Sequence, residues 1–205
     1  MKNILKVIPL VYLLGAGVQI YAQENTFWTV SYSTALPLGE FKDKFIEDFS
    51  FRGFQLDGQK MLSDKLSVGG SVGYQVFRME TEKEYTEFIN TEDYELRING
   101  KQFRYVNAFP IMAGSRYYVK ISPQIRAFAG AGLGAYYIRK RVAIGATNFN
   151  DESWHFGLMP EFGGTITISD NLGISPAIRY NHAFKSSETI TYNYLTFSLG
   201  ITFQE

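Results

Sequence analysis

The chain has 205 residues, with 20 basic against 20 acidic side chains and a formal net charge of +0, so no global charge attracts it to nucleic acid. Its length and the lack of an internal repeat favour a single domain. Cysteine is absent, which excludes disulfide bonds, thiolate metal sites, a cysteine nucleophile and a lipid-modified N-terminal cysteine. The 14 Tyr, 17 Phe and 19 Gly favour β-structure, because aromatic side chains suit pleated surfaces and glycine recurs where strands pack closely.

Residues 1–22 are predicted to form a cleaved signal peptide, which leaves residues 23–205 as the mature domain. Lys2 and Lys6 make a positive start, residues 7–18 are apolar, and Ala22 ends a small-residue cleavage site. A helix of about a dozen residues reaches only about 18 Å, short of the roughly 30 Å hydrocarbon core. No later segment is apolar for long enough to span a bilayer as a helix, so only a closed barrel could cross one.

From Phe27 onward the hydrophobic period is two, which predicts strands rather than helices. We expect eight strands, at Phe27–Leu36, Phe51–Lys60, Lys65–Thr81, Lys101–Ile121, Gln124–Ile144, Ser153–Ile168, Leu172–Lys185 and Tyr192–Phe203. Short turns at 61–64, 122–123 and 169–171 alternate with longer loops at 37–50, 82–100, 145–152 and 186–191. This layout is typical of bacterial outer-membrane barrels. The sequence therefore predicts an all-β fold, an eight-stranded antiparallel up-and-down transmembrane β-barrel with both termini on the periplasmic side.

The last expected strand shows the two faces of the sheet most clearly. Thr196, Ser198 and Thr202 alternate with Phe197 and other bulky apolar residues, so one face is small and polar and the other large and apolar. In a membrane barrel the apolar face points to lipid. The alternative is a soluble secreted barrel of lipocalin type, whose apolar face would point inward and would leave the charges of the polar face in solvent.

Several runs resemble a large family of small outer-membrane β-barrel proteins found in Bacteroidota, related in architecture to OmpA/OmpX-type barrels and often called a porin family. The runs are Pro37–Lys42, Phe51–Phe54, Leu66–Gly70, Trp154–Gly157 with Pro160-Glu161, and Tyr194–Phe197 with Leu199-Gly200. The resemblance spans nearly the whole mature chain. It implies the fold and an outer-membrane location in a Gram-negative cell, and it carries no shared biochemical activity.

Four charged residues are expected to point into the lumen and form a network there. Glu161 and Arg179 share the inward parity across a tight turn, and Arg116 and Asp57 have inward parity too. One interpretation is a charged constriction that selects ions in a small-solute channel. We favour a plug, because eight strands enclose a space just wide enough for their own side chains and each buried charge needs a partner.

Two further patterns give little support to catalysis or cofactor binding. Gly130, Gly132 and Gly134 form G-x-G-x-G, but a strand rather than a helix follows, so a dinucleotide loop is not expected. His182 with Ser186 or Ser187 and Glu188 makes a conceivable hydrolytic set, for which the sequence provides no geometry. We therefore expect no enzyme activity, cofactor or metal.

Two further groups of charged residues lie towards the rim of the longer loops. Glu80 to Glu95 contains seven acidic residues and one basic residue, which is expected to be a solvated tip or a contact for an extracellular partner or divalent cations. Arg139, Lys140 and Arg141 follow an aromatic pair, where they could meet lipopolysaccharide phosphates or offset the acidic loop. Pro110, Pro160 and Pro176 fall within expected strands, so either they lie at bulges or the strands are shorter there.

The sequence thus favours a non-enzymatic outer-membrane barrel with a structural or surface-interaction role and a largely plugged lumen. Its expected partners are outer-membrane lipid, lipopolysaccharide and the barrel assembly machinery during insertion, without nucleic acid, and the expected oligomeric state is a monomer. The alternatives left open are a small-solute channel and a soluble lipocalin-like binding barrel.

Overall fold

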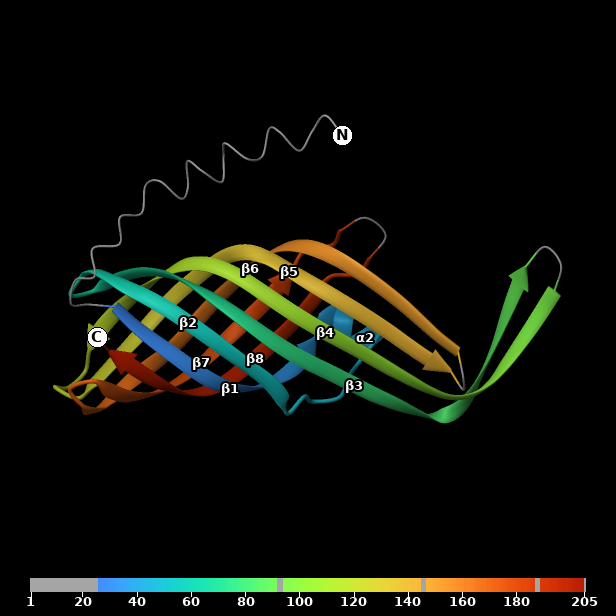
Figure 1. The fold of residues 1–205 in the computed structure, drawn as a ribbon, viewed down its shortest axis with the longest axis horizontal. Helices are drawn as coiled ribbons and strands as arrows, with labels where there is room; N and C mark the ends of the chain where they lie inside the picture. Colours follow the sequence, from blue (N-terminus) through green and yellow to red (C-terminus); the bar gives the residue numbers. More distant parts are fainter. Residues whose placement is uncertain (1–25, 92–93, 145–146, 187–188, 205) are drawn as a thin grey trace, which may run out of the picture.

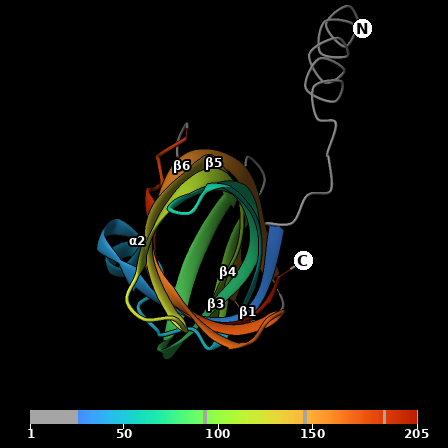
Figure 2. The same ribbon diagram turned by 90° about the vertical axis from the view of Figure 1, so that its left-hand side faces the viewer.

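The computed structural model describes residues 26–91, 94–144, 147–186 and 189–204, which form a closed barrel of eight antiparallel strands joined in sequence order (Figures 1 and 2). The strands are β1 (Thr26–Leu38), β2 (Arg52–Ser63), β3 (Leu66–Thr91), β4 (Tyr94–Lys120), β5 (Ile125–Ile144), β6 (Thr147–Ser169), β7 (Leu172–Ala183) and β8 (Tyr192–Gln204). β1 pairs with β8 and closes the ring. In the described residues no helix is long and apolar enough to cross a bilayer. The predicted all-β up-and-down barrel is confirmed.

The wall of the barrel is taller on one side, because β3 to β6 are much longer than the other strands. β3 and β4 have 26 and 27 residues, whereas β1, β2, β7 and β8 have 12 or 13 (Figure 1). The expected loop at 82–100 is wrong, since β3 and β4 continue as a hairpin to residues 91 and 94. The expected loop at 145–152 is wrong as well, because β6 begins at residue 147. The side chains of residues 82–100 lie outside what the structure describes.

The two faces of the strands are oriented as expected for a membrane barrel. On β8, Phe197 and Leu199 are 39% and 61% exposed, while the alternating Thr196 and Ser198 are 4% and 8% exposed. The same alternation buries Arg179 in the lumen. A lipocalin-type barrel would have the reverse arrangement, with apolar residues inside, so that alternative is wrong.

An aromatic ladder runs across the outer face of five neighbouring strands. Phe54, Tyr74, Phe109, Tyr137 and Trp154 stand opposite one another on β2 to β6, with successive ring centroids 5.9, 4.6, 5.8 and 5.1 Å apart. Such rings prefer the level where hydrocarbon meets water.

The polarity of the outer face changes at this ladder. Towards the short turns the outward residues are apolar, as at Val72, Ile111 and Leu133. Towards the loop end they become charged, as at Arg139, whose Nη2 lies 2.7 Å from Glu152 Oε1. The ladder therefore marks the outer edge of the lipid-facing band on the tall wall.

The three mid-strand prolines interrupt the hydrogen-bond ladder without the bulges that we expected. On β4 the pairs with β3 stop at Ile111 and resume at Ala108 in the same register, which skips Pro110. The β6–β7 ladder has the same kind of gap beside Pro160 and beside Pro176. Each proline still pairs with the strand on its other side. Proline has no backbone N–H, so the hydrogen bond is lost only on the side to which that N–H would have pointed.

A short helix, α2 (Gly39–Lys44), follows β1 within the first expected loop (Figure 1). Gly39 has a φ of 53°, in the left-handed region that favours glycine, and it turns the chain out of the strand. The fully buried Phe41 ring then lies 5.0 Å from the ring of Phe77 on β3 and 5.1 Å from the ring of Tyr192 on β8. The helix therefore joins two sides of the barrel at its loop end.

Polar contacts also hold the α2 segment in place, from β4 and from the segment just before β8. Arg104 on β4 donates to the carbonyl oxygens of Phe45 at 3.1 Å and Lys44 at 3.3 Å. Glu40 accepts a hydrogen bond from Lys44 at 2.6 Å and another from the backbone N–H of Thr191 at 3.0 Å. These two donors hold the pKa of the Glu40 carboxyl below its usual value.

The outward face at mid-barrel can be tested with a charge. Phe197 neighbours Ser198, which contacts the buried Arg179, so Phe197→Arg places a charge on lipid near mid-height. We expect a loss of about 2–4 kcal/mol of unfolding free energy in lipid vesicles. The control is Asn150→Arg, at an exposed outward position of β6 beyond the ladder, which should fold normally. Equal stability of the two variants would contradict the membrane assignment.

Candidate functional site

A charge tetrad of Asp57, Arg116, Glu161 and Arg179 occupies the middle of the lumen. The four side chains come from β2, β4, β6 and β7, and all point inward because each has the inward parity of its strand. Antiparallel pairing sets Glu161 directly opposite Arg179. The structure thus brings together all four residues that the sequence placed on the inner face.

The contacts of the tetrad form a closed ring in which every charge has two partners. Arg116 contacts Glu161 Oε1 at 2.6 Å and Asp57 Oδ1 at 2.9 Å. Arg179 contacts Asp57 Oδ2 at 2.9 Å and Glu161 Oε2 at 3.0 Å. The side chains are at most 6% exposed. Two carboxylates and two guanidiniums cancel in charge, which is what burial in a low dielectric requires.

Two inward-facing neighbours complete the surroundings of the guanidiniums, and the sequence pattern did not connect either of them to the four charges. Arg179 donates from Nη1 to Ser198 Oγ at 2.7 Å, and Arg116 lies 4.7 Å from the centroid of the Phe128 ring. Both contacts come from inward positions of adjacent strands, so inward parity was the signal that could have found them. Arg116 thus gains a cation–π contact on the face that its carboxylates leave open.

Gly130 supplies the space that the tetrad needs. It stands opposite Arg116 on β5, and a Cβ at this position would lie 2.9 Å from Arg116 Cγ and 3.2 Å from Glu161 Oε1. A Cβ would also lie 2.6 Å from the carbonyl oxygen of Ser115. The G-x-G-x-G run is therefore part of a strand that makes room for the charged pair, and it is not a dinucleotide loop.

Apolar clusters close the lumen on both sides of the tetrad. Towards the turns, Phe27, Tyr118, Phe128, Ala177 and the half-buried Met61 pack together. Towards the loops lies a larger cluster, which includes Phe41, Phe77, Val106, Met112, Tyr136, Ile138, Met159, Tyr192 and Tyr194. The void beside the tetrad measures about 10 Å³, room for one water molecule. Side chains therefore occupy the described lumen at the tetrad and on both sides of it.

The three basic residues after the ladder do not act as a group. Arg139 pairs with Glu152, Lys140 Nζ lies 3.2 Å from Asp151 Oδ2, and Arg141 Nη2 donates to Asn148 Oδ1 at 2.8 Å. Carboxylates on β6 thus offset the charges of Arg139 and Lys140, while Arg141 donates to a neutral amide.

The candidate hydrolytic set gains no support from the described residues. His182 Nδ1 lies 2.6 Å from Asn193 Oδ1, and Ser187 and Glu188 fall outside the described residues. His155 is buried, with its ring nitrogens 2.8 Å from Ser153 Oγ and from the carbonyl oxygen of Phe184. Both histidines therefore have structural hydrogen bonds.

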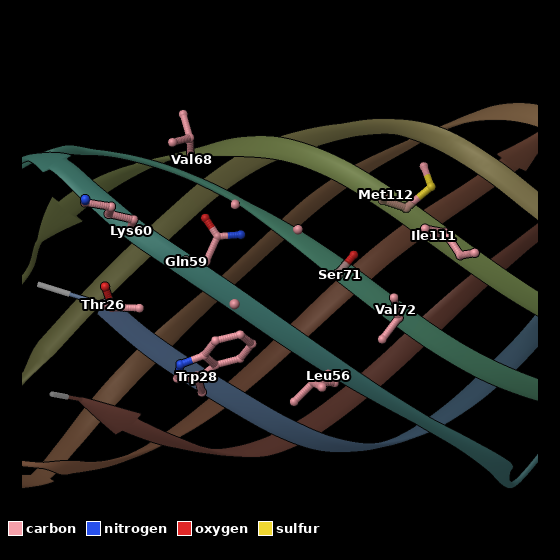
Figure 3. A pocket seen from close by; sticks show the side chains of 13 residues that line it. Thr26, Trp28, Leu56, Gln59, Lys60, Val68, Ser71, Val72, Ile111 and Met112 are labelled. Atoms are coloured by element: carbon pink, nitrogen blue, oxygen red, sulfur yellow. The ribbon is translucent and has the colours of Figure 1, made fainter. Parts of the chain in front are cut away.

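A groove also lies on the outer wall, across β1 to β4 (Figure 3). Gly58 and Gly70 stand opposite one another on its floor, and its rim includes Trp28, Val68 and Val72. Its volume is about 560 Å³ and its lining is mainly apolar. Because this face is turned to lipid, the groove belongs to the membrane contact surface of the barrel.

The family of the chain follows from a comparison with family models. Residues 10–203 match the outer membrane protein beta-barrel domain. The chain belongs to this family. It is accordingly a protein of the outer membrane. A comparison with curated proteins gives no match.

Solved structures of small outer-membrane barrels share this fold. The attachment invasion locus protein Ail of Yersinia pestis is 11% identical, covering 89% of this chain and all of its own, with a TM-score of 0.53. Neisserial surface protein A is 14% identical, covering 88% and 97%, with a TM-score of 0.53. OprG of Pseudomonas aeruginosa is 12% identical, covering 89% and 97%, with a TM-score of 0.50. At these identities the likeness concerns the fold alone.

The tetrad makes a prediction about stability. Glu161→Ala removes a carboxylate from both arginines and leaves an uncompensated buried charge, so we expect a loss of about 3–5 kcal/mol in unfolding free energy. Adding Arg179→Ala restores neutrality, since Asp57 and Arg116 remain paired, and should recover part of the loss.

Urea unfolding in detergent micelles measures this cycle. Glu152→Ala is the matched control, because its pair with Arg139 is solvent-exposed and should change stability little. Additive losses for Glu161→Ala and Arg179→Ala would show that the tetrad is not energetically coupled.

Proposed function

We propose that this protein is a non-enzymatic outer-membrane barrel with a structural or surface-interaction role and a lumen that does not conduct solutes. The observation that carries the proposal is the closed tetrad between two apolar clusters, beside a void of about 10 Å³. A channel needs an open water path, and open aqueous channels belong to barrels of about 16 strands. The sealed lumen leaves the outer surfaces as the places where the protein can act.

The tall wall of β3 to β6 is the surface best suited to an outward role. It extends beyond the aromatic ladder, and its hairpin contains most of the acidic run from Glu80 to Glu95 (Figure 1). Long strands with exposed backbone edges can pair with or dock a partner. Ail, which shares the barrel fold, is named for attachment and invasion. We infer that an extracellular partner would meet this wall.

Export and lipid contacts belong to the same proposal. The segment 1–22 would direct secretion, the barrel assembly machinery would insert the chain, and a monomer would result. The resemblance to barrels of Bacteroidota supports a Gram-negative source. Arg139, Lys140 and Arg141 are the candidates for lipopolysaccharide contact, although phosphates would have to compete with Glu152 and Asp151 for two of them.

Conductance tests the sealed lumen. Residues 23–205 in planar bilayers should give no steady conductance steps, because side chains fill the lumen at the tetrad and on both sides of it. A porin of 16 strands, inserted under the same conditions, serves as the positive control. Large and stable steps from the unmodified protein would contradict the plug and favour the small-solute channel.

A shortened hairpin tests the outward wall. Thr81 and Gln102 are partners in the β3–β4 register, so replacing residues 82–101 with Asn-Gly should leave the barrel able to assemble. An epitope inserted between residues 92 and 93 should be detected by antibody on intact cells. The same epitope between Ser122 and Pro123, in a turn at the opposite end, should be detected only after permeabilisation. The reverse labelling, or failure of the shortened variant to insert, would refute an outward wall.

A further inference from the structure

A cup opens at the turn end of the barrel, on the side of the tetrad away from α2. It has a volume of about 600 Å³, and its lining comes from β1, from the β2–β3 and β4–β5 turns and from the ends of neighbouring strands. Phe27, Met61 and Tyr118 lie at its base. All three belong to the apolar cluster on the turn side of the tetrad. The cup is therefore blind, and short turns place its opening on the periplasmic side.

Three cations line the cup at adjacent positions. Lys120 on β4 stands directly opposite Arg126 on β5, and Lys65 lies opposite Tyr118, whose amide donates to the Lys65 carbonyl at 2.8 Å. Like charges directly opposite one another destabilise a sheet. Neither the closure of the barrel nor the burial of its core requires two cations at this pair.

The surroundings of the three cations do not neutralise them. None of Lys65, Lys120 and Arg126 forms an ion pair with a carboxylate in the part of the chain that the structure describes. The cup lining contains one acidic residue, Asp64, beside Thr167, Gln204 and Ser63. The Arg126 guanidinium lies 5.9 Å from the centroid of the Tyr118 ring, which orients it over the base of the cup.

We propose that the cup binds a phosphate-bearing anion at the periplasmic mouth of the barrel. A volume of about 600 Å³ is within the usual size of a small-molecule pocket, and the lining is more polar than apolar. Arginine matches two oxygens of one phosphate through its planar fork, while lysine contributes point charges. A ligand with two or more negative charges would relieve the repulsion between Lys120 and Arg126. This site is independent of the proposed surface role.

The experiment uses inorganic pyrophosphate as the probe for the protein in detergent micelles. We expect saturable binding by isothermal titration calorimetry and a higher unfolding temperature when pyrophosphate is present. The variant Lys120→Gln/Arg126→Gln should lose at least tenfold in affinity. The control Lys42→Gln/Arg52→Gln removes the same charge at exposed positions of the loop end and should bind as the unmodified protein does.

Two more measurements separate a binding site from simple charge effects. Sulfate at matched ionic strength should not reproduce the binding, because screening alone gives no saturation. Without ligand, Lys120→Gln/Arg126→Gln should be at least as stable as the unmodified protein, since it removes a repulsion. Absent pyrophosphate binding, equal affinity of the two double variants, an equal effect of sulfate, or a less stable ligand-free variant would overturn the proposal.

Nanodiscs then distinguish two sources of the phosphate. If phosphatidylglycerol weakens pyrophosphate binding relative to phosphatidylcholine, the natural ligand is a lipid headgroup of the inner leaflet. If the two lipids give the same affinity, it is a soluble phosphate compound of the periplasm. Either result supports the cup as a phosphate site.

Discussion

Two carboxylates and two guanidiniums share the centre of a lumen where each side chain is at most 6% exposed, and the rest of the barrel is arranged around that constraint. Isolated charges at this depth would be costly, so each must meet both partners of opposite sign. A slip of one residue in any contributing strand would turn its charge to lipid and leave its partners unpaired. The tetrad therefore specifies the register of β2, β4, β6 and β7 together. Gly130 belongs to the same constraint, since any side chain there would displace Arg116.

The outer surface follows the opposite rule, because lipid replaces water as the solvent. Residues such as Leu199 and Phe197, exposed in the isolated chain, are apolar where the barrel meets hydrocarbon. The outward face becomes charged beyond the aromatic ladder, where Arg139 and Glu152 pair. This change of polarity separates a membrane-embedded barrel from the part of the tall wall that meets water.

The two ends of the barrel differ in kind. At the loop end, α2 and the surrounding rings cover the lumen, and Phe41 fills the space between β3 and β8. At the turn end the lumen closes deeper, below Phe27 and Tyr118, and leaves a hollow lined by cations. The tetrad and the two apolar clusters lie between these ends.

The sequence by itself determined the strands, their number and the direction in which most side chains point, because a period of two is a local property that survives without tertiary contacts. The inward parity of Asp57, Arg116, Glu161 and Arg179 and the outward parity of Phe197 were readable for the same reason. Only the tertiary structure decided that all four charges meet, since β2 comes next to none of the other three strands along the sheet and reaches them across the lumen. It also decided that the acidic run continues as a hairpin, where Glu84 stands opposite Lys101, although its composition indicated a loop. Three more features depend on barrel closure and cross-strand pairing, which residue spacing along one strand does not encode. They are the burial of Phe41, the constant strand register at the prolines and the position of Lys120 opposite Arg126.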